Sequence, residues 1–523
     1  MQKKILRLAV GLLFASALFS VTACAQDDDP DWRMTGANAG QSGSKKGESA
    51  FTPENISANF KLLWKLKLGQ PSNGARSFSE PLLAARLING QGFKDLVYWS
   101  SADTLFAVDY ELGALVWKKQ YDMSAVKTAS GCEVSSLSVT MEPPLVINFR
   151  ARRQRPPGTP RPPDPPPAKA SERKLGVAPG GGYFGFKGIY VLTPDGMLHE
   201  QVITTGADFA PPVKFLPAPG ASAYGLNFAD RTIYSSTGRD CSGVPNGAWA
   251  IDFAAGDYQV KSYDTEKLHP LSLTGPVITP QGNSLLVTGT GTSDATAGVY
   301  ASSVVSLSKD MKVQDWYTPK GGMASYESVS PVTFTYKDKQ FVIAPGKDGG
   351  LTLLDAASLG GADHQTPLFE TAPFAKTGEK HGWDGFATWE DKDGTLWVFA
   401  SVSTGITLSD GGLKPTTHGG VVAFKADDAN GKVTLNPVWV SGDMINPAPP
   451  RVVNGIAIAL AGGDSSTHAQ LHILNAATGA ELYSSKDEIP AYTQLSGVSV
   501  GDSHVFFTDH DNVLYSFGIA LEH

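Results

Sequence analysis

The chain has 523 residues, of which 41% are hydrophobic, and a formal net charge of −8 at pH 7. The acidic balance and the lack of a basic stripe along any expected element argue against a nucleic-acid partner. The 56 glycines, 35 prolines and a charged fraction of only 18% are typical of a chain with many short strands and turns.

Residues 1–25 are expected to form a targeting segment. Three basic residues among the first seven are followed by an apolar stretch that extends to residue 19. The sequence VTAC, which ends at Cys24, resembles the lipobox of bacterial lipoproteins, in which the cysteine is acylated. An ordinary cleavage site also fits here. Both interpretations predict export, either with a lipid anchor at Cys24 or as a free protein in the periplasm. No later stretch is long and apolar enough to cross a bilayer.

A short phrase recurs along the rest of the chain: an apolar run, a turn on Asp, Asn or Gly, and a second run that often ends in a large apolar residue. Clear copies are LFAVDYELGALVW, which ends at Trp117, and VVSLSKDMKVQDW, which ends at Trp316. The residues that follow the first run of each copy, 43 to 84 positions apart, are Asp109, Thr193, Asp252, Ser308, Asp355, Lys425, Asn475 and Gly518. Each copy predicts a hairpin, and a further apolar run precedes it.

Three or four short strands in each unit of roughly 45–60 residues are typical of a propeller blade. The last unit, which ends in LYSFGIALEH, lacks its final strand, whereas FKLLWKLKLG at residues 60–69 reads as a strand without a hairpin partner. Pairing these two segments would close the ring and remove two exposed edges. The sequence therefore predicts an all-β fold: one eight-bladed β-propeller over residues 26–523, with four-stranded blades and a closing blade formed by the N- and C-terminal strands.

Residues 150–174 stand apart from this pattern, with eight prolines and eight cations against two carboxylates. Such a composition is extended or disordered and packs no core. We interpret the segment as a flexible Pro/Arg-rich insertion within the propeller. The alternative is an arm that docks on an acidic surface or a proline-binding partner.

The chain has three cysteines. If Cys24 is removed or acylated, Cys132 and Cys241 remain as an even pair in an oxidising compartment. They are either joined by a disulfide or present as two separate thiols.

From Trp32 to its end, the chain resembles the PQQ-repeat superfamily of quinoprotein propellers. The repeats carry the resemblance, together with the opening DWRMTGANAGQSGSKKGESAFTPENISANFKLLWKLKLG and the stretch 284–359, which contains YESVSPVTF and FVIAPGKDGGLTLLDAASLG. The superfamily includes PQQ-dependent alcohol dehydrogenases and non-catalytic assembly lipoproteins of the outer membrane. Its repeat motif is specific for the fold and says less about chemistry.

The resemblance implies a set of site residues. Glu327 falls at the position of a catalytic carboxylate that takes the proton of the substrate hydroxyl. The implied calcium ligands are Glu327, Thr292 and Asp384, and the implied contacts to PQQ are Lys347, Trp383 and Arg76. The alternatives are a solvated loop carboxylate for Glu327, turn residues for Lys347 and Asp384, and a blade-packing role for Trp383.

The chain also departs from the dehydrogenase pattern. Thr292 stands where the dehydrogenases have an asparagine ligand to calcium. No two cysteines are adjacent, although the dehydrogenases stack the quinone on a ring made by such a pair. No Cys-x-x-Cys-His is present, so the sequence predicts no fused haem domain.

Three functions remain open on this basis. The first is an exported quinoprotein-like oxidoreductase that uses PQQ and calcium on an alcohol or sugar, with a separate electron acceptor. The second is a non-catalytic scaffold that binds a protein partner at the cell envelope, and the third is a small-ligand binding protein. In each of these three cases, the protein would be attached to a membrane only through a lipid anchor at Cys24.

Overall fold

The computed structural model describes residues 31–69, 78–89, 92–124, 126, 132, 137–142, 175, 188–253, 258–270, 274–321, 329–346, 349–376, 385–493 and 497–520. The targeting segment with Cys24 and the insertion at 150–174 lie outside these residues. The part described contains no helix long and apolar enough to span a bilayer.

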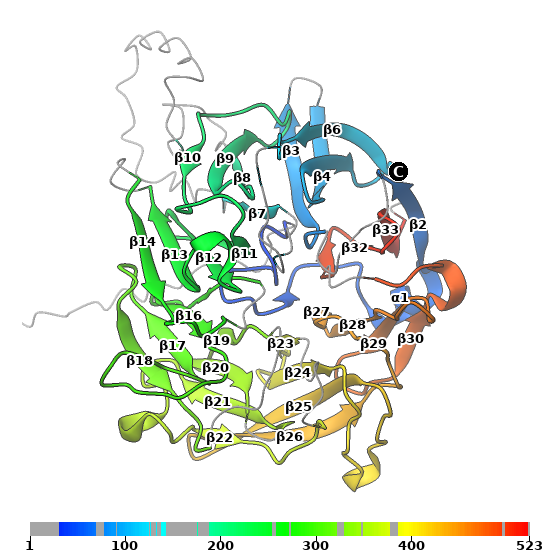
Figure 1. The fold of residues 1–523 in the computed structure, drawn as a ribbon. Coiled ribbons are helices and arrows are strands. Elements are labelled where there is room, and N and C mark those ends of the chain that lie inside the picture. Colours follow the sequence, from blue (N-terminus) through cyan, green and yellow to red (C-terminus); the bar gives the residue numbers. More distant parts are fainter. Residues whose placement is uncertain are drawn as a thin grey trace, which may run out of the picture.

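Eight antiparallel sheets surround a central axis as the blades of a propeller (Figure 1). The first blade contains β3 (Leu82–Asn89), β4 (Gly92–Ser100), β5 (Thr104–Asp109) and β6 (Ala114–Gln120), and the second contains β7 (Ser138–Met141), β8 (Gly188–Leu192), β9 (Met197–Val202) and β10 (Val213–Lys214). The third contains β11 (Ser222–Ala229), β12 (Thr232–Gly238), β13 (Gly247–Asp252) and β14 (Val260–Asp264). The fourth contains β15 (Val277–Ile278), β16 (Ser284–Val287), β17 (Val304–Leu307) and β18 (Val313–Tyr317).

The next three blades contain β19 (Val332–Tyr336), β20 (Lys339–Pro345), β21 (Leu351–Asp355) and β22 (Phe369–Glu370); β23 (Gly385–Glu390), β24 (Leu396–Val402), β25 (Gly420–Ala429) and β26 (Lys432–Val440); and β27 (Arg451–Val453), β28 (Ile456–Ala461), β29 (Gln470–Asn475) and β30 (Glu481–Ser484). A short strand, β1 (Ser44–Lys45), runs parallel to β27 on its axial side. Among the residues described, 3₁₀ turns lie at Cys241–Gly243, Gly361–Asp363, Asp410–Gly412 and Lys486–Glu488.

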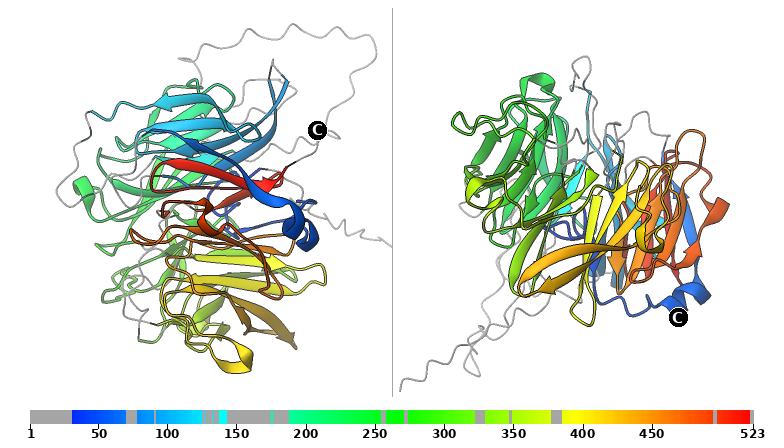
Figure 2. Two further views of the ribbon diagram at one scale, coloured as in Figure 1. Left: turned by 90° about the vertical axis from the view of Figure 1, so that its right-hand side faces the viewer. Right: turned by 90° about the horizontal axis from the view of Figure 1, so that it is seen from below.

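The eighth blade confirms the predicted closure. It combines β31 (Ser499–Gly501), β32 (His504–Thr508) and β33 (Val513–Ile519) with β2 (Phe60–Lys67) from the other end of the chain. Strand β2 pairs antiparallel with β33 from Phe60↔Ile519 to Lys67↔Val513, and the two lie side by side in the left view of Figure 2. The short helix α1 (Pro53–Asn59), capped by the Thr52 side chain, leads into β2. The all-β, eight-bladed fold with four-stranded blades is therefore confirmed.

Each blade runs from an inner strand to an outer strand, and its hairpins alternate between the two ends of the ring. We call the upper face the one at which inner strands begin. The connections between blades and the loops between second and third strands lie there. The lower face carries the loops between first and second strands and between third and fourth strands.

Tryptophans of the outer strands link consecutive blades. The indole N–H of Trp64 donates to the Tyr110 carbonyl (2.7 Å), and that of Trp117 donates to the Ile203 carbonyl (3.2 Å). Both carbonyls belong to the last hairpin turn of the next blade. Trp439 donates in the same way to the Ala476 carbonyl (2.9 Å). The tryptophan at the end of the repeat phrase is thus a contact between blades.

The copy of the repeat phrase at Thr193 does not form the hairpin expected for it, which is the last hairpin of its blade. The turn at Thr193 connects β8 and β9, the second and third strands of their blade. The hairpin equivalent to the other copies turns at Ile203–Gly206, where Trp117 docks. The sequence Pro194-Asp195-Gly196 has the same turn chemistry as the true copies, so composition alone does not separate the two hairpins.

Residues 31–48, which we call the N-terminal strap, cross the centre of the ring as the dark blue segment in the middle of Figure 1. The strap hydrogen-bonds to all eight blades through, in order, Leu83, Met141, Asn227, Ile278, Thr333, Thr388, Val452 and the pair Asp502–Ser503. Four inner-strand N–H groups donate to strap carbonyls at 2.8 to 3.0 Å: Ile278 to Ala39, Thr333 to Gly40, Thr388 to Ser42 and Val452 to Gly43.

Strap glycines permit this close approach. A Cβ on Gly40 would lie 2.6 Å from the Thr333 carbonyl oxygen, and one on Gly43 would lie 2.9 Å from the Ala387 Cβ. Gly43 also has a left-handed φ of +65°, which other residues adopt at a cost. The backbone of the strap therefore lies directly on the inner strands and closes the centre of the ring.

Deletion of residues 60–69 removes β2 and leaves β33 as an open edge. We expect no stable monomer from this variant, because the ring loses its closing pair and exposes an unpaired strand. Thermal unfolding combined with size-exclusion chromatography measures this. A monomer with the stability of the parent would contradict the closure.

Gly113 tests the contact between blades. It has φ +62°, and a Cβ there would lie 2.6 Å from the Trp64 ring, whereas Gly431 has φ +80° and nothing within 4 Å of its added Cβ. Both alanine variants carry the left-handed backbone cost of about 1–2 kcal/mol. Only Gly113→Ala also meets the ring, so we expect it to unfold about 1–3 kcal/mol more easily than Gly431→Ala in urea titrations. Equal losses would show that Trp64 moves aside freely.

Candidate functional site

Each expected site position falls in a segment between two strands whose adjoining ends lie at the upper face. Arg76 lies between β2 and β3, Glu327 between β18 and β19, and Lys347 between β20 and β21. Trp383 and Asp384 lie between β22 and β23. These five residues are outside the part of the chain that the structure describes, so their side chains are not placed. The flanking strands nevertheless begin or end at one face of the ring.

Thr292 is the one expected metal ligand among the described residues. It lies in the loop between β16 and β17, also on the upper face, and is exposed. The loop turns on Asp294, which pairs with Val299 through two backbone hydrogen bonds. Its local structure is thus explained by the turn.

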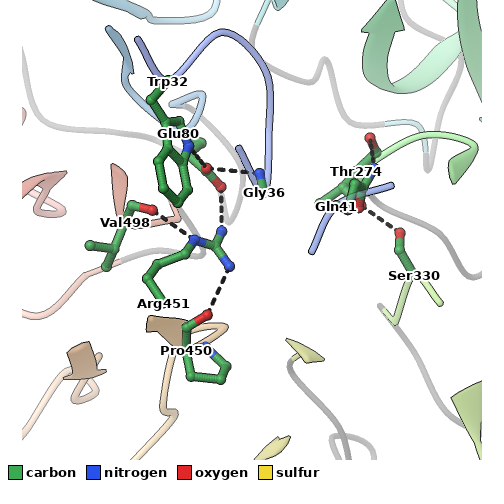
Figure 3. A network of polar contacts seen from close by, with 9 residues as sticks. All are labelled: Trp32, Gly36, Gln41, Glu80, Thr274, Ser330, Pro450, Arg451 and Val498. Carbon is green, nitrogen blue, oxygen red and sulfur yellow. Dashed lines mark hydrogen bonds and ion pairs between the residues drawn. The ribbon is translucent and has the colours of Figure 1, made fainter. Parts of the chain in front are cut away.

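A buried ion pair lies at the upper ends of the inner strands (Figure 3). Glu80, just before β3, accepts from the Trp32 indole (2.7 Å) and the Gly36 N–H (3.0 Å) on one carboxylate oxygen. Its other oxygen accepts from Arg451, the first residue of β27, at 2.7 Å. A Cβ on Gly497 would lie 2.1 Å from that oxygen, so only glycine fits beside it.

The Arg451 guanidinium is held by three further contacts. Its Nε donates to the Val498 carbonyl (2.8 Å), and its Nη1 donates to the Pro450 carbonyl (3.2 Å). The guanidinium carbon lies 5.6 Å from the centre of the Trp32 ring. Only 3% of the Arg451 side chain and 4% of the Glu80 side chain are exposed. The pair therefore joins the first, seventh and eighth blades to the strap, with every charge-bearing group hydrogen-bonded.

A second polar cluster lies across the axis from the ion pair, as Figure 3 shows. The Thr274 hydroxyl donates to the side-chain amide oxygen of Gln41 (2.6 Å) and contacts the Ser330 hydroxyl. The Gln41 amide donates back to the Thr274 carbonyl (3.2 Å). Thr274 and Ser330 precede β15 and β19, so this cluster also stands at the upper ends of inner strands. We call the two clusters together the polar floor.

A disulfide joins Cys132 and Cys241, with 5.9 Å between their Cα atoms. The sequence left open whether this pair is bridged. Cys132 precedes β7 and Cys241 follows β12, so the bond spans the second blade on the upper face. Cys241 is buried, and its sulfur accepts from the Ser222 hydroxyl (3.3 Å) at the start of the inner strand β11. The disulfide thus fixes two upper-face loops relative to each other.

The upper face also carries a histidine–carboxylate pair. His418 Nδ1 lies 2.6 Å from Asp443, whose other oxygen accepts from the backbone N–H groups of Thr417, His418 and Gly419. Partial burial would raise the pKa of Asp443, but these hydrogen bonds outweigh it and lower the pKa. The carboxylate is therefore ionised near neutral pH and orients the imidazole.

The described residues do not by themselves fit a calcium ion. Both oxygens of Glu80 already accept hydrogen bonds, and its nearest cation is Arg451. Within the described ranges, no three His, Cys, Asp or Glu side chains come together as a metal site. Hard oxygen ligands for calcium would have to come from the expected positions in the loops above the polar floor.

Sequence reasoning missed Glu80, Arg451 and the His418–Asp443 pair. Glu80 and Arg451 are 371 positions apart, and no local pattern predicts such a contact. The available signal was indirect: each is a charged residue directly beside an apolar inner-strand run, where burial requires a partner. For His418 no such signal exists, since an exposed loop histidine needs none.

No protein-family model matches the sequence, and no curated protein matches it. Solved structures do resemble the fold. The quinohemoprotein alcohol dehydrogenase of Comamonas testosteroni superposes with a TM-score of 0.59 at 12% identity, covering 94% of this chain and 81% of that one. A europium-containing methanol dehydrogenase gives 0.55 at 14% identity, covering 94% and 99%. A quinohemoprotein alcohol dehydrogenase of Pseudomonas putida gives 0.56 at 12% identity, covering 95% and 81%.

These likenesses define the class of protein: an eight-bladed β-propeller with the quinoprotein fold, as the sequence predicted. At identities of 12–14%, these superpositions support the fold alone, so the chemistry has to be argued from the residues of the site.

Glu80→Ala leaves Arg451 buried without its counter-charge. We expect a loss of about 3–5 kcal/mol in the free energy of unfolding, measured by urea titration. The control is Lys119→Ala, which breaks an ion pair of 2.8 Å with Asp208 at the surface and should change stability by less than about 1 kcal/mol. Similar small losses in both variants would contradict a structural role for the polar floor.

Proposed function

We propose that the protein is an exported quinoprotein-like oxidoreductase that oxidises an alcohol or sugar, with PQQ bound on the upper face above the polar floor. One observation supports this proposal: the strands that flank all six expected site positions begin or end at the same face of the ring. The polar floor lies at the upper ends of the inner strands, at that face. The quinoprotein dehydrogenases that share the fold support the choice of PQQ.

Each expected residue has a role in this proposal. Glu327 accepts the proton of the substrate hydroxyl. Lys347, Arg76 and Trp383 hold and stack the cofactor, and Asp384, Thr292 and Glu327 supply oxygen ligands to calcium. PQQ, when bound, takes up the two electrons of the oxidation. The polar floor and the disulfide would fix the loops from below and from the side.

Export belongs to the same proposal. In bacteria a lipid on Cys24 would place the propeller at the cell envelope, where Cys132 and Cys241 remain oxidised. Cys24→Ala would then move the protein from the membrane fraction to the soluble fraction.

A second candidate is a propeller that binds a small ligand or protein partner without turnover. The pairing in the polar floor favours it: the charged and amide groups of Glu80, Arg451 and Gln41 bond to protein partners.

The test is to titrate the full exported protein with PQQ and calcium, and to measure both binding and dye reduction with a panel of alcohols and sugars. We expect PQQ to bind at micromolar concentration and Glu327→Gln to lose turnover at least about 100-fold while still binding PQQ. Glu54→Gln, an exposed change in α1, is the matched control.

Two results would contradict the proposal in different ways. Absence of PQQ binding at micromolar concentration would remove the oxidoreductase function and leave the second candidate. Binding with unchanged turnover in Glu327→Gln would keep the function and remove Glu327 as the proton acceptor.

A further inference from the structure

A cavity of about 610 Å³ opens on the lower face, on the side of the strap opposite to the site proposed above. Its wall at the axis is the strap, which contributes lining residues from Asp31 to Lys46. The remaining wall is formed by the lower ends of three inner strands, β11, β15 and β23, and by Thr333 of β19. Because the strap backbone lies directly on the inner strands, this cavity has a rigid wall and a volume suited to a small ligand.

The charges that line the cavity are balanced. Arg33 pairs with Asp31, and Lys45 pairs with Glu48 at 2.8 Å. The other charged lining residues are Lys46, Glu390 and Asp230, of which Asp230 pairs with Lys309 at 3.1 Å. A ligand with a strong net charge would therefore find no surplus of opposite charge here. The lining favours a neutral ligand.

One tryptophan lines the cavity. Trp389, at the lower end of β23, is half-buried, and a Cβ on Gly455 would lie 3.2 Å from its ring. Met34, Phe228 and Ile278 add apolar side chains to the lining. An indole plane offers a platform for the C–H face of a sugar ring, which carries few hydroxyl groups.

Hydroxyl and amide groups also line the cavity. Asn38, Ser42, Ser44 and Thr279 line the cavity and present short polar side chains. Asn38 and Ser42 bond to each other at 2.6 Å, which orients both while the second amide hydrogen of Asn38 keeps donor capacity. Neutral donors and acceptors beside an aromatic plane match a polyhydroxylated ligand.

We propose that this cavity is a carbohydrate-binding site for a neutral sugar of one to three rings. It lies on the other side of the strap from the oxidoreductase site and does not depend on that proposal. The upper face of the ring would then carry out the oxidation, and the lower face would bind a glycan.

The test measures binding of glucose, maltose and maltotriose to the full chain without PQQ, by saturation-transfer NMR and calorimetry. We expect saturable binding that strengthens with ring number. Trp389→Phe and Asn38→Ala should each weaken it about tenfold, which corresponds to about 1.4 kcal/mol. The controls are Trp316→Phe and Asn436→Ala, which alter a half-buried tryptophan and an exposed asparagine outside the cavity.

The outcomes separate the two faces. Binding that is lost in the cavity variants and kept in the controls supports the proposal. Binding that persists unchanged in both Trp389→Phe and Asn38→Ala places the sugar elsewhere, such as the upper face, and overturns it. Absence of binding for all three sugars at tens of millimolar overturns it as well, whatever the outcome with PQQ.

Discussion

The structure depends on how the ring covers the inner edges of its blades. Every blade begins with an inner strand whose free N–H and C=O groups face the axis, and an uncovered edge is unstable and open to wrong pairing. The strap meets this constraint for the ring as a whole, because its carbonyls accept from one inner strand after another. Each such bond contributes only about 0.5–1.5 kcal/mol, but leaving the same groups buried and unpaired would cost more. The Glu80–Arg451 pair holds the strap where the ring closes.

This arrangement also explains why two different sites can share one axis. The strap divides the centre of the ring into an upper region above the polar floor and a lower cavity. Since both rest on one segment that contacts all eight blades, both inherit its rigidity. Function is then decided by loops on one face and by strand ends on the other, which is how one fold carries unrelated activities.

The architecture could be predicted from the sequence because each hairpin is marked locally by apolar runs and turn residues. The strand at residues 60–69 alternates and lacks a partner, the last unit lacks a strand, and the structure pairs the two. The hairpin at Thr193 was placed wrongly because its turn residues suit either hairpin of a blade. The polar floor was out of reach, because Glu80 and Arg451 meet only after all blades have formed. Cys132 and Cys241 were suggested by counting, and only the fold shows them to be neighbours.

The most direct test of the strap's role is amide hydrogen exchange at the four inner-strand residues that donate to it: Ile278, Thr333, Thr388 and Val452. If the strap is an integral part of the ring, these four amides exchange only through global unfolding, with the same free energy as amides in the middle strands. The Glu80→Gln variant should then lower all of these free energies together. Exchange of the four amides through a separate opening, with the middle strands still protected, would show that the strap is a detachable segment and would contradict the account.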